Sequence, residues 1–143
     1  MSYKNILIVA FASSVSGCAI TQTVTPVAKF ENKEICVVVN PAVMQPAFVE
    51  TYQRLLTGKG YDVRALPPAS SVASCPVTST YTANWRWDLA LYMAYADIQV
   101  FADGKLSGQA VYDSRRGGAN MSKFIKAEEK LSELVDQLFP NKR

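Results

Sequence analysis

The sequence predicts an α+β fold, a two-layer sandwich in which one mixed sheet of four to five strands carries two helices on one face. Three observations predict it. A short β-branched run at residues 35–39 is followed by apolar residues at helical spacing. Alternating segments flank Asp103-Gly104, a strong hairpin signal. The chain closes with an amphipathic stretch at residues 122–138, so the expected order is β-α-β-β-β-β-α over a single domain at residues 34–143.

The N-terminal residues have the features of a targeting segment that is removed from the mature protein. Lys4 precedes an apolar run at residues 6–12, far shorter than the roughly 20 residues of a membrane-spanning helix. Residues 1–17 are therefore predicted to be an export signal peptide. Val15-Ser16-Gly17-Cys18 resembles the lipobox of bacterial lipoproteins, which implies cleavage before Cys18 and transfer of lipid to its thiol. The alternative is an ordinary signal peptide followed by a buried thiol.

The lipobox resemblance also implies a location. Each buried CH₂ of an acyl chain is worth about 0.8 kcal/mol, and the two or three chains of a lipoprotein cysteine hold a protein stably on a membrane. Aspartate directly after the lipidated cysteine tends to retain lipoproteins in the inner membrane. Ala19 occupies that position, so we expect the inner leaflet of the outer membrane, with the domain facing the periplasm.

Composition limits the classes of partner. Removing residues 1–17 leaves 126 residues, enough for one domain with a core, and lowers the formal net charge from +3 to about +2. Nucleic-acid binding is not expected, because it would call for a clustered basic face.

The first part of the mature chain is predicted to be a tether followed by a buried strand. Residues 18–33 contain Pro26 and show no sustained periodicity, so they are expected to be a lipidated tether that could reach about 40 Å. Residues 35–39 are expected to form a strand buried on both faces, and Asn40-Pro41 stops it.

A helix and a second strand are expected next. Pro46 suits the first turn of a helix, and Gly58 and Gly60 end it. Apolar residues at helical spacing lie between them: Phe48, Tyr52, Leu55 and Leu56. Residues 61–66 alternate as a strand, and a strand, helix, strand order predicts a parallel crossover.

The middle of the chain predicts antiparallel sheet. In residues 77–88, one face would carry Tyr81, Ala83, Trp85 and Trp87. Strands at 90–102 and 105–113 would be joined by the two-residue turn Asp103-Gly104. That turn sets the pairs Ala102 with Lys105, Val100 with Ser107, and Ile98 with Gln109. The pattern does not decide which face of the sheet is core.

The last helix is expected at residues 122–138, capped by Ser122 and ended by Pro140. Its apolar stripe comprises Phe124, Ala127, Leu131, Leu134 and Leu138, widened by Ile125 and Val135.

Two cysteines remain once Cys18 carries lipid. Export to an oxidising compartment favours a disulfide between Cys36 and Cys75, and the alternative is two independent buried thiols. A zinc site is not expected, because the sequence contains no histidine.

The first candidate binding site comprises Tyr81, Trp85, Arg86, Trp87 and Asp88. Exposed indoles on a strand could form a platform for a glycan or a peptide, with Arg86 and Asp88 adding hydrogen bonds. The alternative, which tryptophan burial favours, is that both tryptophans pack beneath a helix.

The second candidate is the loop that contains Arg115, Arg116, Gly117, Gly118 and Asn120. Two guanidinium groups near a helix N-terminus could hold a phosphate or a carboxylate of lipid, lipopolysaccharide or peptidoglycan. The alternative is a solvated turn whose glycines satisfy backbone geometry.

Catalysis and a cofactor are not expected. The sequence has no histidine, no serine in a nucleophile-elbow pattern and no phosphate-binding glycine loop. A hydrolase would have to use two of the strand aspartates Asp88, Asp97 and Asp113 as an acid/base pair.

Many short motifs together resemble a family of short proteobacterial lipoproteins of unknown function. They are residues 39–41, 58–64, 75–76, 81–83, 85–92, 103–105, 112–113, 115–118 and 123–140. The resemblance implies localisation, but no activity and no binding residues.

The sequence leaves three functions open. The leading one is a non-catalytic lipoprotein that binds an envelope protein, peptidoglycan or an anionic glycolipid, and it predicts an exposed aromatic or apolar patch on the sheet face away from the helices. The second is a small-ligand or lipid-binding module, which needs an apolar pocket of several hundred Å³. The third is the aspartate hydrolase.

Overall fold

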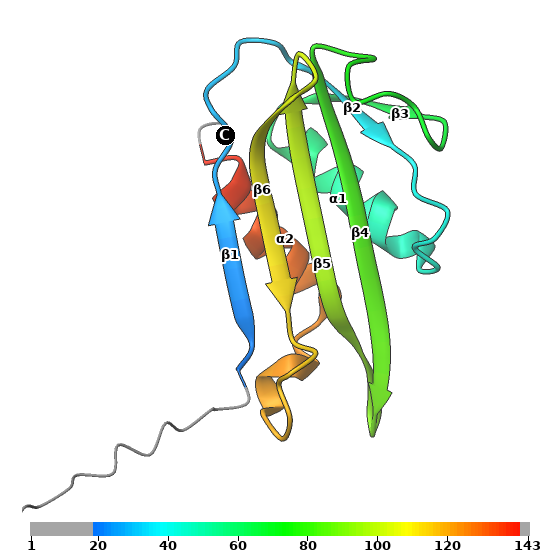
Figure 1. The fold of residues 1–143 in the computed structure, drawn as a ribbon, viewed down its shortest axis with the longest axis vertical. Helices are drawn as coiled ribbons and strands as arrows, with labels where there is room; N and C mark the ends of the chain where they lie inside the picture. Colours follow the sequence, from blue (N-terminus) through cyan, green and yellow to red (C-terminus); the bar gives the residue numbers. More distant parts are fainter. Residues whose placement is uncertain (1–18, 141–143) are drawn as a thin grey trace, which may run out of the picture.

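The computed structural model describes residues 19–140 and places six strands in one sheet, in the order β1-β6-β5-β4-β2-β3 (Figure 1). The elements are β1 (Thr21–Thr25), β2 (Glu34–Val38), α1 (Pro46–Gly58), β3 (Asp62–Leu66), β4 (Val77–Asp88), β5 (Ala90–Ala102), β6 (Lys105–Asp113), the 3₁₀ helix η1 (Met121–Phe124) and α2 (Ala127–Leu138). The α+β class with one mixed sheet and two α-helices is confirmed. The expected four to five strands were too few.

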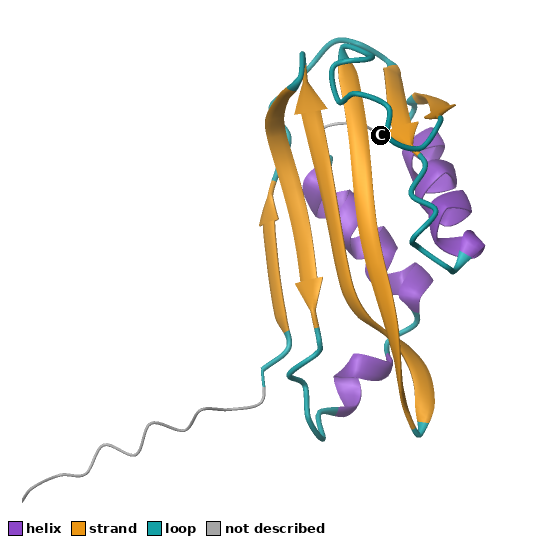
Figure 2. Cartoon of the chain, turned by 45° about the vertical axis from the view of Figure 1, so that its right-hand side comes forward, coloured by secondary structure: helices purple, strands orange, loops and turns teal. Residues whose placement is uncertain are grey.

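Helices α1 and α2 cover the same face of the sheet (Figure 2). Alternate residues of the central strands point into this layer and are fully buried: Ala96, Ile98, Val100, Ala110 and Tyr112. The helices contribute Tyr52, Leu56, Leu131, Leu134, Val135 and Leu138. The apolar stripe predicted for the last helix is therefore largely confirmed from Leu131 onward.

The parallel part of the sheet follows the expected crossover. Strand β2 pairs in parallel with β3 on one side and with β4 on the other, and α1 connects β2 to β3. Pro46 lies in the first turn of α1, as predicted, where its missing N–H is harmless.

The expected tether is partly sheet. Strand β1 pairs antiparallel with β6 from Thr21 opposite Asp113 to Thr25 opposite Gln109, and Val27 is buried. A Cβ on Gly108 would lie 2.6 Å from Val27 Cγ1, so the glycine allows the chain after β1 to approach β6. Sequence periodicity misses this edge strand because most of its side chains are polar.

The β5–β6 hairpin has the predicted turn but a different register. Asp103 and Gly104 have φ of 49° and 77°, as a type I′ turn requires, and Ala102 pairs with Lys105. A bulge then shifts the ladder, so Val100 pairs with Gly108 and Ile98 with Ala110. The predicted pairs with Ser107 and Gln109 are wrong. The extra residue turns Ala110 and Tyr112 toward the helices and leaves Gln109 on the other face.

The last helix is shorter than predicted. It begins at Ala127 without a side-chain cap, and the separate helix η1 precedes it. Ser122 caps neither helix: it lies inside η1, where Asn120 is the N-cap and its Oδ1 accepts from the Ser122 N–H, and α2 has no side-chain cap. Ile125 and Lys126 are extended, with ψ of 140° and 134°, and this breaks the predicted 122–138 helix.

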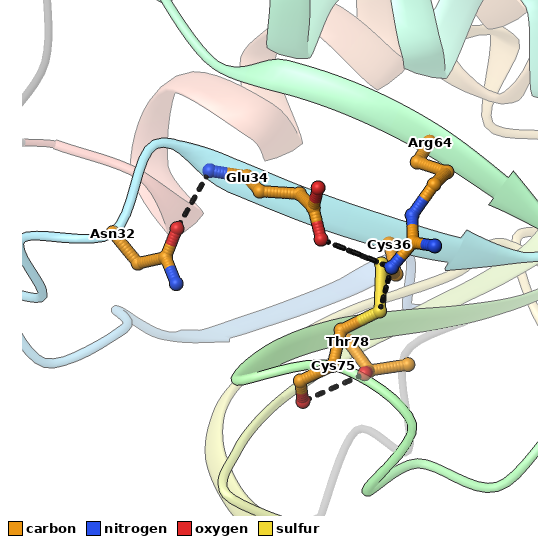
Figure 3. Close-up of a disulfide and its surroundings, with 6 residues drawn as sticks. All are labelled: Asn32, Glu34, Cys36, Arg64, Cys75 and Thr78. Carbon is orange, nitrogen blue, oxygen red and sulfur yellow. Dashed lines mark hydrogen bonds and ion pairs between the residues drawn. A yellow bond between two sulfur atoms is a disulfide. The ribbon is translucent and has the colours of Figure 1, made fainter.

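The predicted disulfide between Cys36 and Cys75 is present and joins β2 to the loop before β4 (Figure 3). Arg64 donates to Glu34 Oε1 at 3.0 Å beside it. Glu34 and the two sulfur atoms lie within 4.8 Å of one another. Because the sulfurs are bonded to each other, they are not the thiolates that a metal site would require.

Candidate functional site

The aromatic residues predicted to form a platform are separated by the fold. Tyr81 is 3% exposed and packs against Phe48 and Tyr52, with ring centroids 5.5 Å and 6.3 Å away. Trp85 is half-buried and meets Phe48 edge-on at 5.9 Å. Trp87 is 75% exposed. The core interpretation therefore fits Tyr81 and Trp85, and only Trp87 is free to form a contact surface.

The sheet face away from the helices does not carry the expected apolar patch. Its residues alternate with the buried ones along β4, β5 and β6 and are mostly polar, among them Thr80, Thr82, Asn84, Asp97, Gln99 and Gln109. That prediction was wrong about the face, because the large apolar side chains of β4 point to the helix side. Exposed Trp87, Leu89 and Leu91 lie at the end of the β4–β5 hairpin, which extends beyond α1 and α2 (Figure 1).

We name the end of the β4–β5 hairpin, with Trp87, Leu89 and Leu91, the hairpin tip. Trp87 pairs with Leu91 across the two strands, and Leu89 forms the turn and is 87% exposed. Among the described residues six large apolar side chains are exposed, and four of them, these three and Met121, lie at this end of the molecule. Such a concentration is typical of a contact surface.

The backbone at the hairpin tip is strained. Leu89 has a φ of 62°, and the left-handed region disfavours L-residues by about 1–2 kcal/mol. A leucine at a position that suits glycine, with its side chain in solvent, gains nothing in the isolated fold that offsets this strain. The observation therefore favours a role for the side chain outside the fold.

Replacing Leu89 with glycine is expected to raise the free energy of unfolding by up to about 1 kcal/mol, because glycine adopts positive φ without the steric penalty. Denaturant unfolding measures the change. Leu91→Gly is the control, since it removes an exposed leucine from a strand interior and is expected to lower the free energy of unfolding by about 1 kcal/mol. A clear loss of stability in Leu89→Gly would show that the leucine supports the fold.

A buried lysine holds the hairpin tip to the rest of the domain. Lys123 is 4% exposed, and its Nζ donates to the Asp88 carboxylate and, at 2.5 Å, to the Gly118 carbonyl. The ammonium also lies 5.4 Å from the Tyr92 ring centroid and 5.2 Å from that of Phe124. The sequence pattern missed this residue because Lys123 occupies a polar position of the predicted helix.

Three arginines, Arg86, Arg115 and Arg116, lie at the same end of the molecule as the hairpin tip. Arg115 Nε and Nη2 donate to the two Asp113 oxygens at 2.9 Å and 2.5 Å, and its guanidinium lies 4.5 Å from the Tyr95 ring centroid. The hydrogen bond from Arg115 holds the pKa of Asp113 below its usual value. An open hollow of about 580 Å³ is lined by Ala19, Thr21, Arg86, Asp113, Arg115 and Arg116.

The loop glycines and Asn120 have structural roles. A Cβ on Gly117 would lie 3.0 Å from Ser114 O and 3.2 Å from Ile20 Cγ1, and Gly118 has a φ of 51°. Asn120 Oδ1 accepts from Ser122 N at the start of η1. The turn interpretation thus fits Gly117, Gly118 and Asn120. At the start of η1, the Asn120 side chain accepts from the backbone N–H that an anion was expected to contact.

The strand aspartates each have a partner. Asp88 pairs with Lys123, Asp97 accepts from Gln109 at 2.9 Å, and Asp113 pairs with Arg115. Asp97 and Asp113 are diagonal neighbours on β5 and β6, which corresponds to about 7–8 Å. That spacing is within reach of a glycosidase pair, in which the lowered pKa of Asp113 would suit the ionised partner and not the acid.

Two apolar hollows are small. One of about 40 Å³ lies beside Phe30 and Phe139, and a groove of about 180 Å³ lies between Phe48, Trp85 and Leu131. A small-ligand pocket typically needs about 300–1,000 Å³. Neither hollow reaches that volume, and a larger open one of about 810 Å³ along α1 and α2 is lined mostly by charged and polar side chains.

Cys18, the predicted lipidation site, lies outside the described residues. The described chain begins with the next residue, Ala19, at the end of the sheet that carries the hairpin tip (Figures 1 and 2). Across residues 19–140, none of the helices has the length and hydropathy needed to cross a bilayer.

No family model and no curated protein matches the sequence. The fold is similar to that of PelC. A PelC dodecamer from Paraburkholderia phytofirmans superposes with a TM-score of 0.58 at 15% identity, covering 83% of this chain and 98% of that one. A single-residue variant of the same dodecamer gives 0.59 at 14% identity, with coverage of 84% and 98%. At this identity the likeness to PelC establishes the fold alone.

Proposed function

We propose that this chain is an envelope lipoprotein, held on the periplasmic face of the outer membrane by acyl chains on Cys18, whose α+β domain acts as a non-catalytic binding or assembly module. The observation that carries the proposal is the lipobox at residues 15–18 followed almost at once by a folded strand, since β1 begins at Thr21. The domain would then sit close to the bilayer and not at the end of a 40 Å tether.

The surface features support a binding role more than a catalytic one. The exposed apolar side chains and the arginines gather at the end where the anchor would enter. The candidate partners remain those of the envelope: a protein, peptidoglycan or an anionic glycolipid. Resemblance to short proteobacterial lipoproteins fits the same assignment.

A Cys18→Ser variant tests the anchor. We expect the wild-type chain to fractionate with outer membranes on a density gradient and the variant to leave that fraction, because its serine cannot accept the diacylglycerol group. A Met44→Ser variant is the matched control, since it also introduces one serine but at an exposed position outside the lipobox, and it should keep its place in the gradient. Identical membrane fractionation of wild type and Cys18→Ser would contradict the proposal.

Assembly into a large oligomer is a second candidate. The PelC structures are dodecamers, and the sheet of this chain ends in two edge strands, β1 and β3, whose outer sides are open to pairing. Sedimentation of the detergent-solubilised lipoprotein distinguishes a monomer of 15.7 kDa or less from a large oligomer. A monomer over the full concentration range would exclude the large oligomer.

A further inference from the structure

We propose that the hairpin tip and the neighbouring arginines Arg86 and Arg116 form a membrane-docking surface, which inserts apolar side chains into an anionic phospholipid leaflet beside the lipid anchor. This inference rests on the proposed function, because it takes Cys18 to be lipidated. It adds that the domain itself contacts the bilayer in a fixed orientation.

The lipid anchor and the hairpin tip are expected at the same end of the domain. The start of the described chain and the hairpin tip lie at the same end of the sheet in both views (Figures 1 and 2). Residues 18–20 reach at most about 10 Å beyond β1, whose first residue Thr21 is level with Asp113 and Tyr95. The hairpin continues for six residues from Tyr95 to Leu89, about 20 Å. The two points thus differ in height by about 10 Å, and a tilt of the domain brings Cys18 and Leu89 to one plane.

The chemistry of the tip suits an interface between water and hydrocarbon. Trp87 is an indole, the ring that favours the headgroup level of membranes, and Leu89 and Leu91 lie beside it with 87% and 55% exposure. Leu89 keeps its strained backbone while its side chain is in solvent. Burial in acyl chains would supply the contact that the isolated fold does not give this side chain.

The charges next to the tip complement an anionic leaflet. Arg86 and Arg116 line the hollow that Ala19 borders, and the carboxylate in this hollow, Asp113, is occupied by Arg115. Arg86 and Arg116 are exposed and can face lipid phosphates. Among residues 19–140 neither guanidinium group forms a salt bridge, so the hollow presents two exposed positive charges next to the point where the anchor would enter.

The two tryptophans make the test specific, because the chain has no others. In the lipidated full-length protein, Trp85→Phe leaves Trp87 as the only indole, and Trp87→Phe leaves Trp85 as the matched control. Each is reconstituted in vesicles of phosphatidylethanolamine and phosphatidylglycerol with brominated acyl chains, which quench tryptophan within the bilayer. We expect Trp87 emission to be quenched and shifted to shorter wavelength, and Trp85 emission to be unchanged.

The arginines have a separate readout. Replacing phosphatidylglycerol with phosphatidylcholine should reduce the quenching of Trp87, and the double change Arg86→Gln with Arg116→Gln should abolish the difference between the two lipids. Each arginine at an anionic surface is expected to change the docked-to-undocked ratio about fivefold.

Two negative results separate the docking surface from the lipid anchor. A protein that floats with the vesicles but whose Trp87 is not quenched overturns the docking surface and leaves the anchor intact, and the tip is then free for a protein partner. A protein that does not float with the vesicles overturns both the anchor and the docking. Equal quenching of Trp85 and Trp87 would also overturn the proposal, because Trp85 is packed against α1.

Discussion

Removing the Cys36–Cys75 disulfide is expected to lower the free energy of unfolding by about 4 kcal/mol. The bond closes a loop with a sequence separation of 39 residues, and the chain-entropy model assigns about 4 kcal/mol to a loop of that length. It joins β2, the strand at the centre of the parallel part of the sheet, to the loop that leads into β4. Losing it frees α1 and β3 in the unfolded chain, because both lie inside the closed loop.

Denaturant unfolding of a Cys36→Ala, Cys75→Ala double variant measures this effect. Wild type treated with a thiol reductant is the control, and it should show a similar loss because both changes open the same loop. Both cysteines are buried, so the double variant also loses a little packing. An unfolding midpoint that the reductant leaves unchanged would show that the bond does not contribute to stability.

Replacing Asp88 with alanine is expected to lower the free energy of unfolding by about 3 kcal/mol, the lower end for breaking a buried ion pair, since the carboxylate is half exposed. The Lys123 side chain is only 5% exposed, so its ammonium would keep a single oxygen partner, the Gly118 carbonyl. Hydrogen exchange of residues 86–92 and 118–124 should rise first, because the lysine joins these segments.

The double variant Asp88→Ala, Lys123→Met gives the decisive comparison. Methionine keeps the contacts with Tyr92 and Phe124 and removes the buried charge, so it should recover most of the stability that Asp88→Ala loses. Equal destabilisation of the single and double variants would mean that the carboxylate stabilises the domain by some means other than its pairing with Lys123.

The sequence could predict elements whose signal is local. The β-branched run at β2, Pro46 at the start of α1 and the Asp103-Gly104 turn each specify their structure through their own residues. The disulfide was also predictable, because export and a count of two remaining cysteines favour it.

Features that depend on tertiary contacts were missed. Strand β1 is polar, and it exists because β6 offers an edge and Gly108 admits Val27. The bulge that displaces Ser107 depends on the fit of Ala110 and Tyr112 against the helices. Both are properties of the assembled sheet and leave no periodic signal in the chain.

The sequence predicted only part of the candidate site, because the rest also depends on tertiary packing. Alternation correctly placed Tyr81, Trp85 and Trp87 on one face of β4. It could not show that β4 extends beyond α1, so that the first two pack in or against the core and Trp87 is exposed. The length by which a strand extends beyond the helices that cover it depends on the lengths of both layers. The pattern within one strand does not contain that information.

Metabolic labelling with a clickable palmitate analogue shows whether lipid is attached to the thiol of Cys18. We expect label on the mature chain, confined to the peptide that begins with Cys18, and no label on the Cys18→Ser variant. A wild-type chain that is exported but carries no label would exclude the lipid anchor, and the membrane-docking surface would lose its basis with it.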